Sequence, residues 1–545
     1  MVEIDFNPYG FSKTKRETSF EAEEILFKSY KMYKQKAVRI SEGNSEFVDN
    51  PSQIRLIDYI GGDDTMLLAA TGGFGLDITQ FKSQIDFFRF LRQNKIREPF
   101  KFTELKFHIE CPIKPALIIV PYSEANVNEY SGRYSVMSDV FHLPDIKDKM
   151  KLKKIVDTYA LAAKSYEGFL EKDFTKELSR NVLGLGNFTQ FYWKLNLESL
   201  FDFISENESK HLEMQPYVNA FKKIAKCVAP IAYVSFESVD NNSDFSDLEA
   251  ILDFYKIQKS RKPLDNPHGI SETKRLCIEK AENELFNPKK CLEQGYLSLI
   301  DYMGGDESIV QAARVSYGRG TKKVSQDNEL IRYLYRHGHT TPFEMVELSF
   351  EAKLPFFVER QWVRHRTADK TGIAGLFLPC KDFYFPEESQ IRKQSKSNKQ
   401  GRAEEMCEND KLEILDTFYT NYLEQSMKEI LVKGVGHFMH WTWKCDLKNI
   451  LNFLNLRLDE HAQHEVREYA KEMAGIVKEV SPFSWKAFND YTLHSINFSK
   501  AETEILNEML SGKSFNKDIM EKAGIHNKFE QGEVEKKFGN LRFWE

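Results

Sequence analysis

Apolar positions alternate with polar ones along some stretches of the chain and recur at helical spacing along others. The stretch VELSFEAKLPFFVERQWV (346–363) opens with alternating Val, Leu, Phe and Ala, which predicts a strand. Helical spacing marks SIVQAARV (308–315) and DNELIRYLYRHG (327–338), and the second stretch ends at a glycine after a basic last turn. Residues 445–480 have the pattern of one long amphipathic helix or a pair of helices. The pattern therefore predicts a mixed α and β fold.

One pattern occurs twice. LIDYIGGDDTMLLAA at 56–70 returns as LIDYMGGDESIVQAA at 299–313, an offset of 243 residues. Further along, FYWKLNLESLFDF at 191–203 aligns with WTWKCDLKNILNF at 441–453, an offset of 250, so the second copy has gained seven residues, which we assign to the polar stretch 392–405. A period this long excludes a solenoid.

The repeat predicts two tandem copies of one domain, over 45–240 and 289–495. Because oligomers are usually symmetric, the two copies are expected to pair inside the chain as a dimer would. An N-terminal extension (1–44), a helical connector (241–288) and a C-terminal helical extension (496–545) complete the predicted organisation.

Composition narrows the class of protein. The chain has 545 residues, 41% of them hydrophobic, and a net charge of −6, so no overall basic field for nucleic acid is expected. It has no apolar run of about 18 residues or more and no apolar core of a signal peptide, so we expect no membrane partner. Seven scattered cysteines, an odd number with no CxxC pair, favour a reduced, cytoplasmic location.

The stretch RQWVRHRTADKTGIAGLF (360–377) contains three adjacent cationic residues, Arg364, His365 and Arg366. Such a group suits an anionic ligand, but the residues that follow carry little polar chemistry. At the offset of 243 the first copy has PYS (121–123) in place of RHR, followed by the polar stretch EANVNEYSGRYS (124–135). Each copy therefore carries one half of a polar motif, the cationic RHR in the second copy and the polar stretch in the first, and lacks the other half.

Joined together, the two halves resemble RHRxxSxNExSxRYS, the signature of flavin-dependent thymidylate synthases, which is continuous in one chain in that family. The segments HGHTTPFE (337–344), AARVSYG (312–318), NKQGR (398–402) and LNFLNLRLDEHAQHEVREYA (451–470) are similar to other blocks of the family, in order. The second copy resembles the family over most of its length, and the first chiefly through NEYSGRYS (128–135). The resemblance implies an α/β (α+β) fold in two copies, which form an intramolecular pseudo-dimer with one composite site.

The resemblance also implies which residues form that site. In the family the nucleotide lies between subunits, held by the QWxR segment and a helix arginine of one subunit and by the NExSxR segment of its partner. The catalytic residue here would be Arg457, which would activate the pyrimidine. Substrate binding would involve Gln361, Arg364, Glu129, Ser131, Gly132, Arg133, Arg180 and Arg457. Cofactor binding would involve His339, Thr341, Arg364, His365, Arg366, Asn452, Asn196 and Glu129.

The activity implied is the reductive methylation of dUMP to dTMP, with FAD as cofactor and with methylenetetrahydrofolate and NADPH as co-substrates. The implied partners are these small molecules and a second copy of the chain, with no nucleic acid and no metal. Two alternatives stay open at this point. One is a flavin- and folate-dependent methylation or hydroxymethylation of another pyrimidine deoxynucleotide, and the other is a non-catalytic, nucleotide-binding relative.

Other candidate chemistry in the sequence is weaker. Cys380 follows a proline, as the nucleophile of the unrelated cysteine-dependent thymidylate synthases does, but Lys381 stands where those enzymes have a histidine. His461 and His464 are three residues apart without a third ligand nearby, which favours a structural or solvent-facing role over a metal site. The Gly-Gly pairs of YIGGDD and YMGGDE fit a turn before a helix better than a phosphate loop.

Overall fold

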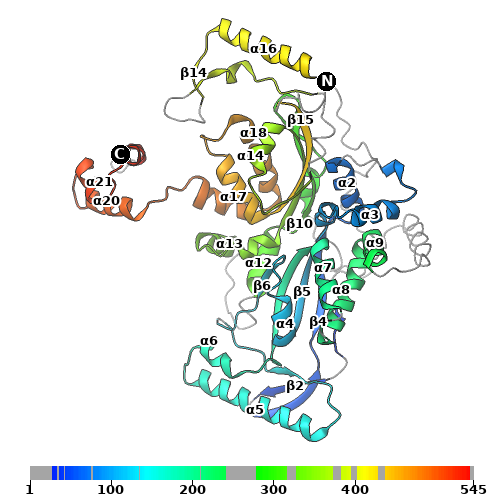
Figure 1. The fold of residues 1–545 in the computed structure, drawn as a ribbon. Helices are drawn as coiled ribbons and strands as arrows, with labels where there is room; N and C mark the ends of the chain where they lie inside the picture. The colour runs from blue at the N-terminus through cyan, green and yellow to red at the C-terminus, as the bar shows by residue number, and fades with distance from the viewer. Residues whose placement is uncertain are drawn as a thin grey trace. The chain divides into compact units, whose positions relative to one another are not determined.

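The structure, a computed structural model, describes residues 28–33, 36–41, 43–74, 78–133, 135–208, 210, 212–240, 278–315, 327–371, 382–394, 402–426 and 436–539 (Figure 1). It divides into two compact units, Met1–Lys486 and Ala487–Glu545. The first unit contains both copies of the repeat. None of the helices in the described ranges is long and apolar enough to span a membrane.

The first copy is built on a five-stranded antiparallel sheet of order β1-β4-β5-β8-β6. Its strands are β1 (Tyr30–Lys31), β4 (Gln53–Ile60), β5 (Glu104–Pro112), β6 (Asn126–Glu129) and β8 (Phe188–Asn196). Strand β1 lies before residue 45, where the first copy was predicted to begin, so the sheet takes in part of the predicted N-terminal extension.

The second copy repeats this sheet, with the order β12-β15-β11-β10-β9. Its strands are β9 (Lys289–Cys291), β10 (Gly295–Met303), β11 (Glu347–Pro355), β12 (Asp369–Thr371) and β15 (Phe438–Asp446). The likeness extends to irregularities, because a register shift between Leu56 and Asp58 in the first copy recurs between Leu299 and Asp301, 243 residues later. The duplication predicted from the sequence is thus confirmed at the level of the sheets.

The helices follow the same two offsets. Helix α3 (Gln84–Gln93), the 3-10 helix η2 (Glu98–Phe102) and helix α4 (Ile113–Ile119) correspond to α13 (Asp327–Arg336), η6 (Thr341–Met345) and α14 (Phe356–Trp362). After the seven-residue gain, α7 (Leu197–Asn207) corresponds to α17 (Leu447–Arg457). Of the two alternatives predicted for 445–480, one long helix or a pair, the structure has the pair, α17 and α18 (His464–Val480), after the end of β15.

An aspartate at the start of one helix fixes the start of another in both copies. Asp63 opens α2 (Asp63–Phe74), and its carboxylate accepts hydrogen bonds from the backbone N–H groups of Ile231 and Ala232, in α9 (Pro230–Asp240). Asp306 opens α12 (Asp306–Val315) and accepts in the same way from Phe483 and Ser484. A carboxylate stabilises free N–H groups at the positive end of a helix, which explains the conserved geometry within the chain.

The core of the first copy lies between its sheet and the helices α3, α7, α8 (Gln215–Val228) and α9 (Figure 1). Buried aromatic side chains dominate it, including Phe107, Trp193, Phe203 and Phe221, whose rings contact one another. Trp362, Trp443 and Phe453 form the corresponding aromatic group of the second copy. The opposite faces of the two sheets are turned towards each other.

Each copy also carries elements that the other lacks. In the first copy, β2 (Lys36–Ser41), β3 (Asn44–Asp49) and β7 (Val140–His142) form a three-stranded sheet beside α5 (Lys149–Glu171), with a small core of its own. In the second copy, β13 (Arg392–Gln394) pairs with β14 (Arg402–Glu405), before α16 (Glu408–Ser426). The remaining short elements are η1 (Ile78–Gln80), α6 (Lys176–Ser179), η3 (Arg180–Val182), η4 (Leu212–Met214), α11 (Glu279–Glu284), η7 (Glu388–Gln390), α19 (Pro482–Phe488) and the π-helical η9 (Asn489–Leu493).

The C-terminal unit is helical, as predicted, with α20 (Lys500–Leu510), α21 (Lys517–Lys522) and α22 (Lys528–Gly539) around a core that includes Ile505 and Phe538. Ser499 and Glu502 form a reciprocal capping box at the start of α20. Residues 241–277 of the predicted connector (241–288) lie outside the described residues. Cys380 and most of NKQGR (398–402) also lie outside them.

Candidate active site

Helix α17 presents Arg457 on its last turn. The guanidinium Nη2 donates a 2.9 Å hydrogen bond to the backbone oxygen of Gln361, at the end of α14. The side-chain amide of Gln361 donates in turn to Gln463, which donates to Glu465 at 2.9 Å. The predicted residues Arg457 and Gln361 are therefore brought together within the second copy, and a polar chain fixes both.

His365 lies beside Arg457. Its ring packs against Phe453 of α17, with 4.9 Å between ring centroids. Burial, and then the positive charge of Arg457, lower the pKa of His365 to about 4, so the imidazole is neutral at neutral pH. Burial also lowers the pKa of Arg457. Arg364 and Arg366, on either side of His365, are exposed.

Two buried nitrogen atoms in this group have no protein partner. Within the part of the chain that the structure describes, neither His365 Nε2 nor Arg457 Nε has a hydrogen-bond partner, although both atoms are shielded from solvent. A buried donor without a partner costs free energy of about 1–3 kcal/mol. The pair therefore fits a ligand that supplies acceptors at this place.

The first copy contributes β6 and the turn that follows it. Glu129, the last residue of β6, accepts a 2.9 Å hydrogen bond from the hydroxyl of Thr189 on β8. Burial raises the pKa of Glu129, and the Thr189 bond and the charge of Arg180 act against this rise. Two predicted residues of the first copy, Glu129 and Arg180, thus lie close together.

Gly132 provides space for Arg180. A Cβ atom at Gly132 would lie 2.6 Å from Met137 Sδ and 3.0 Å from Arg180 Cδ, closer than side chains approach. Glycine at this position therefore allows the Arg180 side chain to lie against the backbone of the turn. Ser131 and Arg133 flank Gly132, and the Ser131 hydroxyl lies 3.4 Å from the backbone nitrogen of Arg133. Arg133 is exposed.

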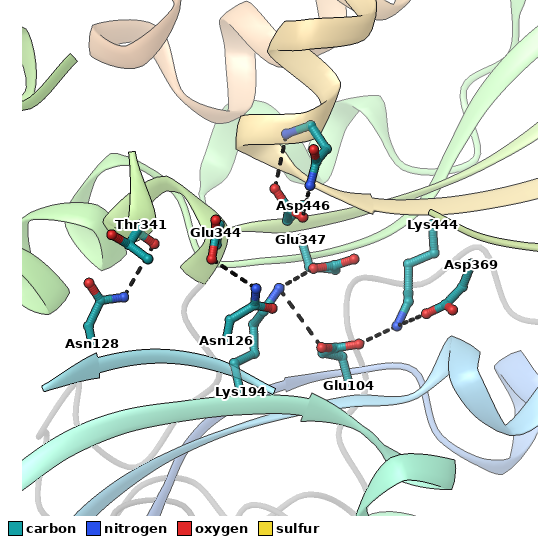
Figure 2. Close-up of polar contacts among 11 residues, drawn as sticks. Glu104, Asn126, Asn128, Lys194, Thr341, Glu344, Glu347, Asp369, Lys444 and Asp446 are labelled. Atoms are coloured by element: carbon teal, nitrogen blue, oxygen red, sulfur yellow. Dashed lines mark hydrogen bonds and ion pairs between the residues drawn. The ribbon is translucent and has the colours of Figure 1, made fainter. Parts of the chain in front are cut away.

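A direct contact joins strand β6 of the first copy to the second copy. The amide Nδ2 of Asn128, on β6, donates a 3.2 Å hydrogen bond to the backbone oxygen of Thr341 (Figure 2). Thr341 opens η6, which also packs against α17. Strand β6, whose last two residues begin the NEYSGRYS segment (128–135), therefore lies against the HTTPFE segment (339–344) of the other copy. His339 lies one turn earlier, with its ring 6.2 Å from that of Tyr333, and it is exposed.

The two predicted asparagines have different surroundings. Asn452 is exposed on α17. Asn196 is the N-cap of α7, where its side chain accepts a 2.9 Å hydrogen bond from the backbone nitrogen of Ser199. Asp446 caps α17 in the same way in the second copy. Since Asn and Asp are both good N-caps, the Asn196–Asp446 difference is compatible with a structural role alone.

Sequence reasoning missed a buried group behind Gln361. Glu465 accepts hydrogen bonds of 2.6 Å from both Arg402 and Tyr384. Burial alone would raise the pKa of Glu465, but these bonds lower it overall, which keeps the carboxylate charged. The available signal was the block NKQGR, whose final residue is Arg402.

The equivalent place in the first copy is filled by ion pairs. Asp202 stands where the second copy has Asn452, and it lies 3.3 Å from Arg97. Arg97 also lies 3.2 Å from Glu198, which is paired with Arg92 at 2.9 Å. The charged groups around this position are therefore ion-paired with one another, although Arg92 Nε and Glu198 Oε1 have no hydrogen-bond partner among the described residues.

A cavity of about 620 Å³ opens between the copies beside β8 and α12. The first copy lines it with His108, Gln190 and Tyr192, and the second with residues of α12 that include Arg314. None of the residues predicted from the sequence is part of its lining, so we base the candidate site on the hydrogen-bonded groups above and not on this cavity.

Known proteins resemble this chain in sequence. The profile of the family described as "Thymidylate synthase complementing protein" matches residues 55–231 and 298–483. A flavin-dependent thymidylate synthase of Ehrlichia ruminantium (strain Gardel) is 43% identical over 255 residues, which cover 44% of this chain and 86% of that protein. The flavin-dependent thymidylate synthase of Wolbachia pipientis wMel is 40% identical over 260 residues, which cover 45% of this chain and 92% of that protein.

Among solved structures, a UMP/dUMP methylase, PolB from Streptomyces cacaoi, matches with a TM-score of 0.34 and 23% identity, over 38% of this chain and 100% of that chain. A likeness of this size carries no argument about function. The family profile, by contrast, matches well over half of the chain in two separate segments, one in each copy. The chain therefore belongs to the family of flavin-dependent thymidylate synthases, as an enzyme that carries the family's domain twice in tandem.

Proposed function

We propose that this enzyme converts dUMP to dTMP by reductive methylation, with FAD as cofactor, methylenetetrahydrofolate as carbon donor and NADPH as reductant. We propose further that it does so at one composite site per chain. The contact of Asn128 with Thr341 carries this second part, because it sets the NEYSGRYS segment of the first copy against the second copy. Only the second copy has the RHR segment and Arg457.

The donor set around α17 fits an anionic nucleotide cofactor and substrate. Arg364, Arg366, Arg133 and Arg180 can supply charge-assisted hydrogen bonds to phosphate and pyrophosphate groups. The partnerless nitrogens of His365 and Arg457 offer two further positions for a ligand acceptor. When bound, the reduced flavin supplies the reducing equivalents of the reaction. The protein holds its ligands with His339, Thr341, Asn452 and the RHR segment.

Arg457 has a role of its own in the proposal. Its guanidinium is fixed by the Gln361 carbonyl and lies partly buried, so it is preorganised. Aimed at the O2/N3 edge of uracil, it would stabilise the negative charge that forms when N3 loses its proton. A well-placed donor of this kind contributes about 3 kcal/mol to the transition state. The greater electron density at C5 then allows that carbon to attack a one-carbon electrophile without an enzyme nucleophile.

The expected partners follow from this chemistry. They are dUMP, the folate, NADPH and a second chain that pairs with the first unit to make a four-copy assembly. The cytoplasmic location and the absence of a nucleic-acid partner stay predictions from the sequence.

The proposal is tested by release of tritium from dUMP labelled at C5. Purified holoenzyme with NADPH and methylenetetrahydrofolate should release tritium and form dTMP. Labelled dCMP and dUMP should be run side by side, since release from dCMP alone would identify a different pyrimidine substrate. Colourless protein that neither binds nucleotide nor releases tritium would overturn the proposal, whereas nucleotide binding without tritium release would indicate a non-catalytic, nucleotide-binding relative.

A further inference from the structure

Charged side chains are buried where the two copies face each other. Lys194 on β8 and Lys444 on β15 are each 1% exposed, and they occupy equivalent positions, 250 residues apart. Lys194 bonds to Glu347 of the second copy and lies 3.8 Å from Glu104 of its own copy. Lys444 bonds to Glu104 of the first copy and lies 3.1 Å from Asp369 (Figure 2).

These lysines remain charged in the folded chain. Burial acts to lower the pKa of Lys194 and of Lys444, but the carboxylates around them raise both above the usual lysine value. A buried ion pair adds little stability relative to apolar packing, whereas removal of one partner is costly. Buried pairs of this kind are best suited to select a partner.

Two pairs of equivalent positions differ in charge. Position 101 of the first copy is lysine and its equivalent, 344, is glutamate, while position 126 is asparagine and its equivalent, 369, is aspartate. Across the interface, Asn126 Nδ2 donates a 2.9 Å hydrogen bond to Glu344 (Figure 2). In the matching contact, β12 with Asp369 packs beside η2 with Lys101, whose charge acts against the burial-driven rise in the pKa of Asp369.

Pairing of two like copies would bring different residues into contact. If two second copies paired in the same geometry, Asp369 of one would meet Glu344 of the other, and this would happen twice. A pair of like charges in a partly buried interface is less favourable than an unlike pair by several kcal/mol. Lys106, whose equivalent is Ser349, and Asn196, whose equivalent is Asp446, add to the same bias, since they make the first face more positive than the second.

We propose that the face between the copies is a charge-coded interface that admits the unlike copy and disfavours the pairing of two second copies. Its partner chemistry is defined on each side: a face with Lys101 and Asn126 fits a face with Glu344 and Asp369. The code excludes assemblies in which two chains join through their second copies. It holds whatever substrate the enzyme uses.

A double-mutant cycle on the uncut chain tests the coupling. Lys101→Glu should lower the midpoint of thermal unfolding, because it sets a carboxylate beside Asp369. Asp369→Asn, which copies the residue of the first copy, should itself lower the midpoint, because Asp369 is paired with the buried Lys444, and it should remove most of the effect of Lys101→Glu. The exposed Lys82→Glu serves as control and should show no coupling to Asp369→Asn. Additive effects of Lys101→Glu and Asp369→Asn would overturn the proposal.

Selectivity is tested with a full chain that carries a protease site between residues 240 and 278. After folding and cleavage, native mass spectrometry should detect pairs of a first with a second half and no pairs of two second halves. The variant Glu344→Lys, Asp369→Asn, Lys448→Glu gives the second copy the residues of the first at three positions, and it should also yield pairs of two second halves. Pairs of two second halves or separated halves from the wild type would overturn the proposal, as would a variant that forms unlike pairs only.

Discussion

His365 and Tyr122 occupy equivalent positions in the two copies and have equivalent neighbours. The ring of His365 lies 4.9 Å from Phe453, and that of Tyr122 lies 5.2 Å from Phe203, which is the equivalent phenylalanine. The packing has been retained and the chemistry has changed, since Tyr122 donates to the backbone oxygen of Ser199 whereas His365 keeps a buried nitrogen without a partner in the described chain. Function at this position therefore depends on one side chain in a shared frame.

Replacement of Arg457, which lies one helix turn after Phe453 on α17, tests the same idea. We expect Arg457→Ala to lower kcat about 100–1000-fold, because one donor to the developing charge is lost. The matched control is Asn207→Ala, which alters the equivalent residue of the first copy, a buried amide bonded to the oxygen of Phe203 at 2.9 Å. Steady-state rates of tritium release should fall for the first variant only. Equal losses for both variants would contradict a single composite site.

Arg133 tests the half of the site that the first copy supplies. Arg133→Ala should lower kcat/KM about 10–100-fold, since a hydrogen bond to a charged phosphate is worth about 1.5–3 kcal/mol. Arg133 is exposed, so the fold should be retained. Titration with dUMP, followed by flavin absorbance, gives the affinity directly. Unchanged affinity and turnover would make the composite site wrong even though the family assignment stands.

Lys106 makes the stability of the enzyme depend on pH. Burial lowers its pKa to about 8 in the folded chain, whereas an unfolded lysine has a pKa of about 10.4. Between these values the unfolded chain binds a proton that the folded chain does not, so the free energy of unfolding rises with pH, by up to about 3 kcal/mol. Lys106→Met should abolish this rise, measured by denaturant unfolding from pH 7.5 to 10.5. The exposed Lys149→Met should retain it.

At the scale of elements, the turn after β6 shows how backbone places charge. Gly132 lets Arg180, at the start of η3, reach the turn from a separate segment, while Thr189 of β8 holds Glu129. The cation and the carboxylate thus come from different elements and meet only because β6 pairs with β8. The turn and η3 work as one unit.

Gly132→Ala should therefore disturb binding before it disturbs the fold. The added Cβ would displace Arg180 or Met137, so we expect a rise in the KM for dUMP with a small change in kcat and in the unfolding midpoint. Gly168→Ala, in α5, is the control, because a Cβ there meets nothing within 4 Å. If Gly132→Ala left KM unchanged, the proximity of Arg180 to the turn would have no bearing on the substrate.

At the scale of the whole first unit, two sheets of the same strand order face each other. The two equivalent positions beside them, around α17 and around α7, differ in how their polar groups are paired. Around α17, His365 Nε2 and Arg457 Nε have no hydrogen-bond partner among the described residues, whereas around α7 Arg97 is paired with Glu198 and Asp202. The two copies thus repeat their backbone pattern but differ in charge at these two places.

The flavin content per chain follows from this asymmetry. We expect about one FAD per 545-residue chain, because the ion pairs of Arg97 occupy the position that Asn452 and its neighbours leave open in the second copy. Absorbance of the released flavin, set against amino-acid analysis of the same sample, gives the ratio. A ratio near two would show that both places bind.

The sequence by itself determined the duplication, the family and the candidate residues, because each depends on order along the chain. The offsets of 243 and 250 anticipated equivalent strands, helices and a recurrent bulge, since a repeated pattern of apolar positions folds in the same way twice. Loss of RHR from one copy and of NExSxR from the other was visible without coordinates. Helix boundaries were less well defined: the pattern of 445–480 left one long helix or a pair open, and the structure has the pair.

Only the tertiary structure decided which groups meet. Nothing in the order of residues pairs Asn128 with Thr341, or Lys444 with Glu104, 340 residues away. The neutral state of His365 likewise arises from burial and from Arg457, which are properties of the packed site. Lysines within the apolar strands FYWKLN and WTWKCD gave the only hint of the charged interface, and a lone charge in a strand acquires meaning when its partner across the interface is known. The physical reason is that pairing energies depend on distance and solvent exclusion, which the fold alone supplies.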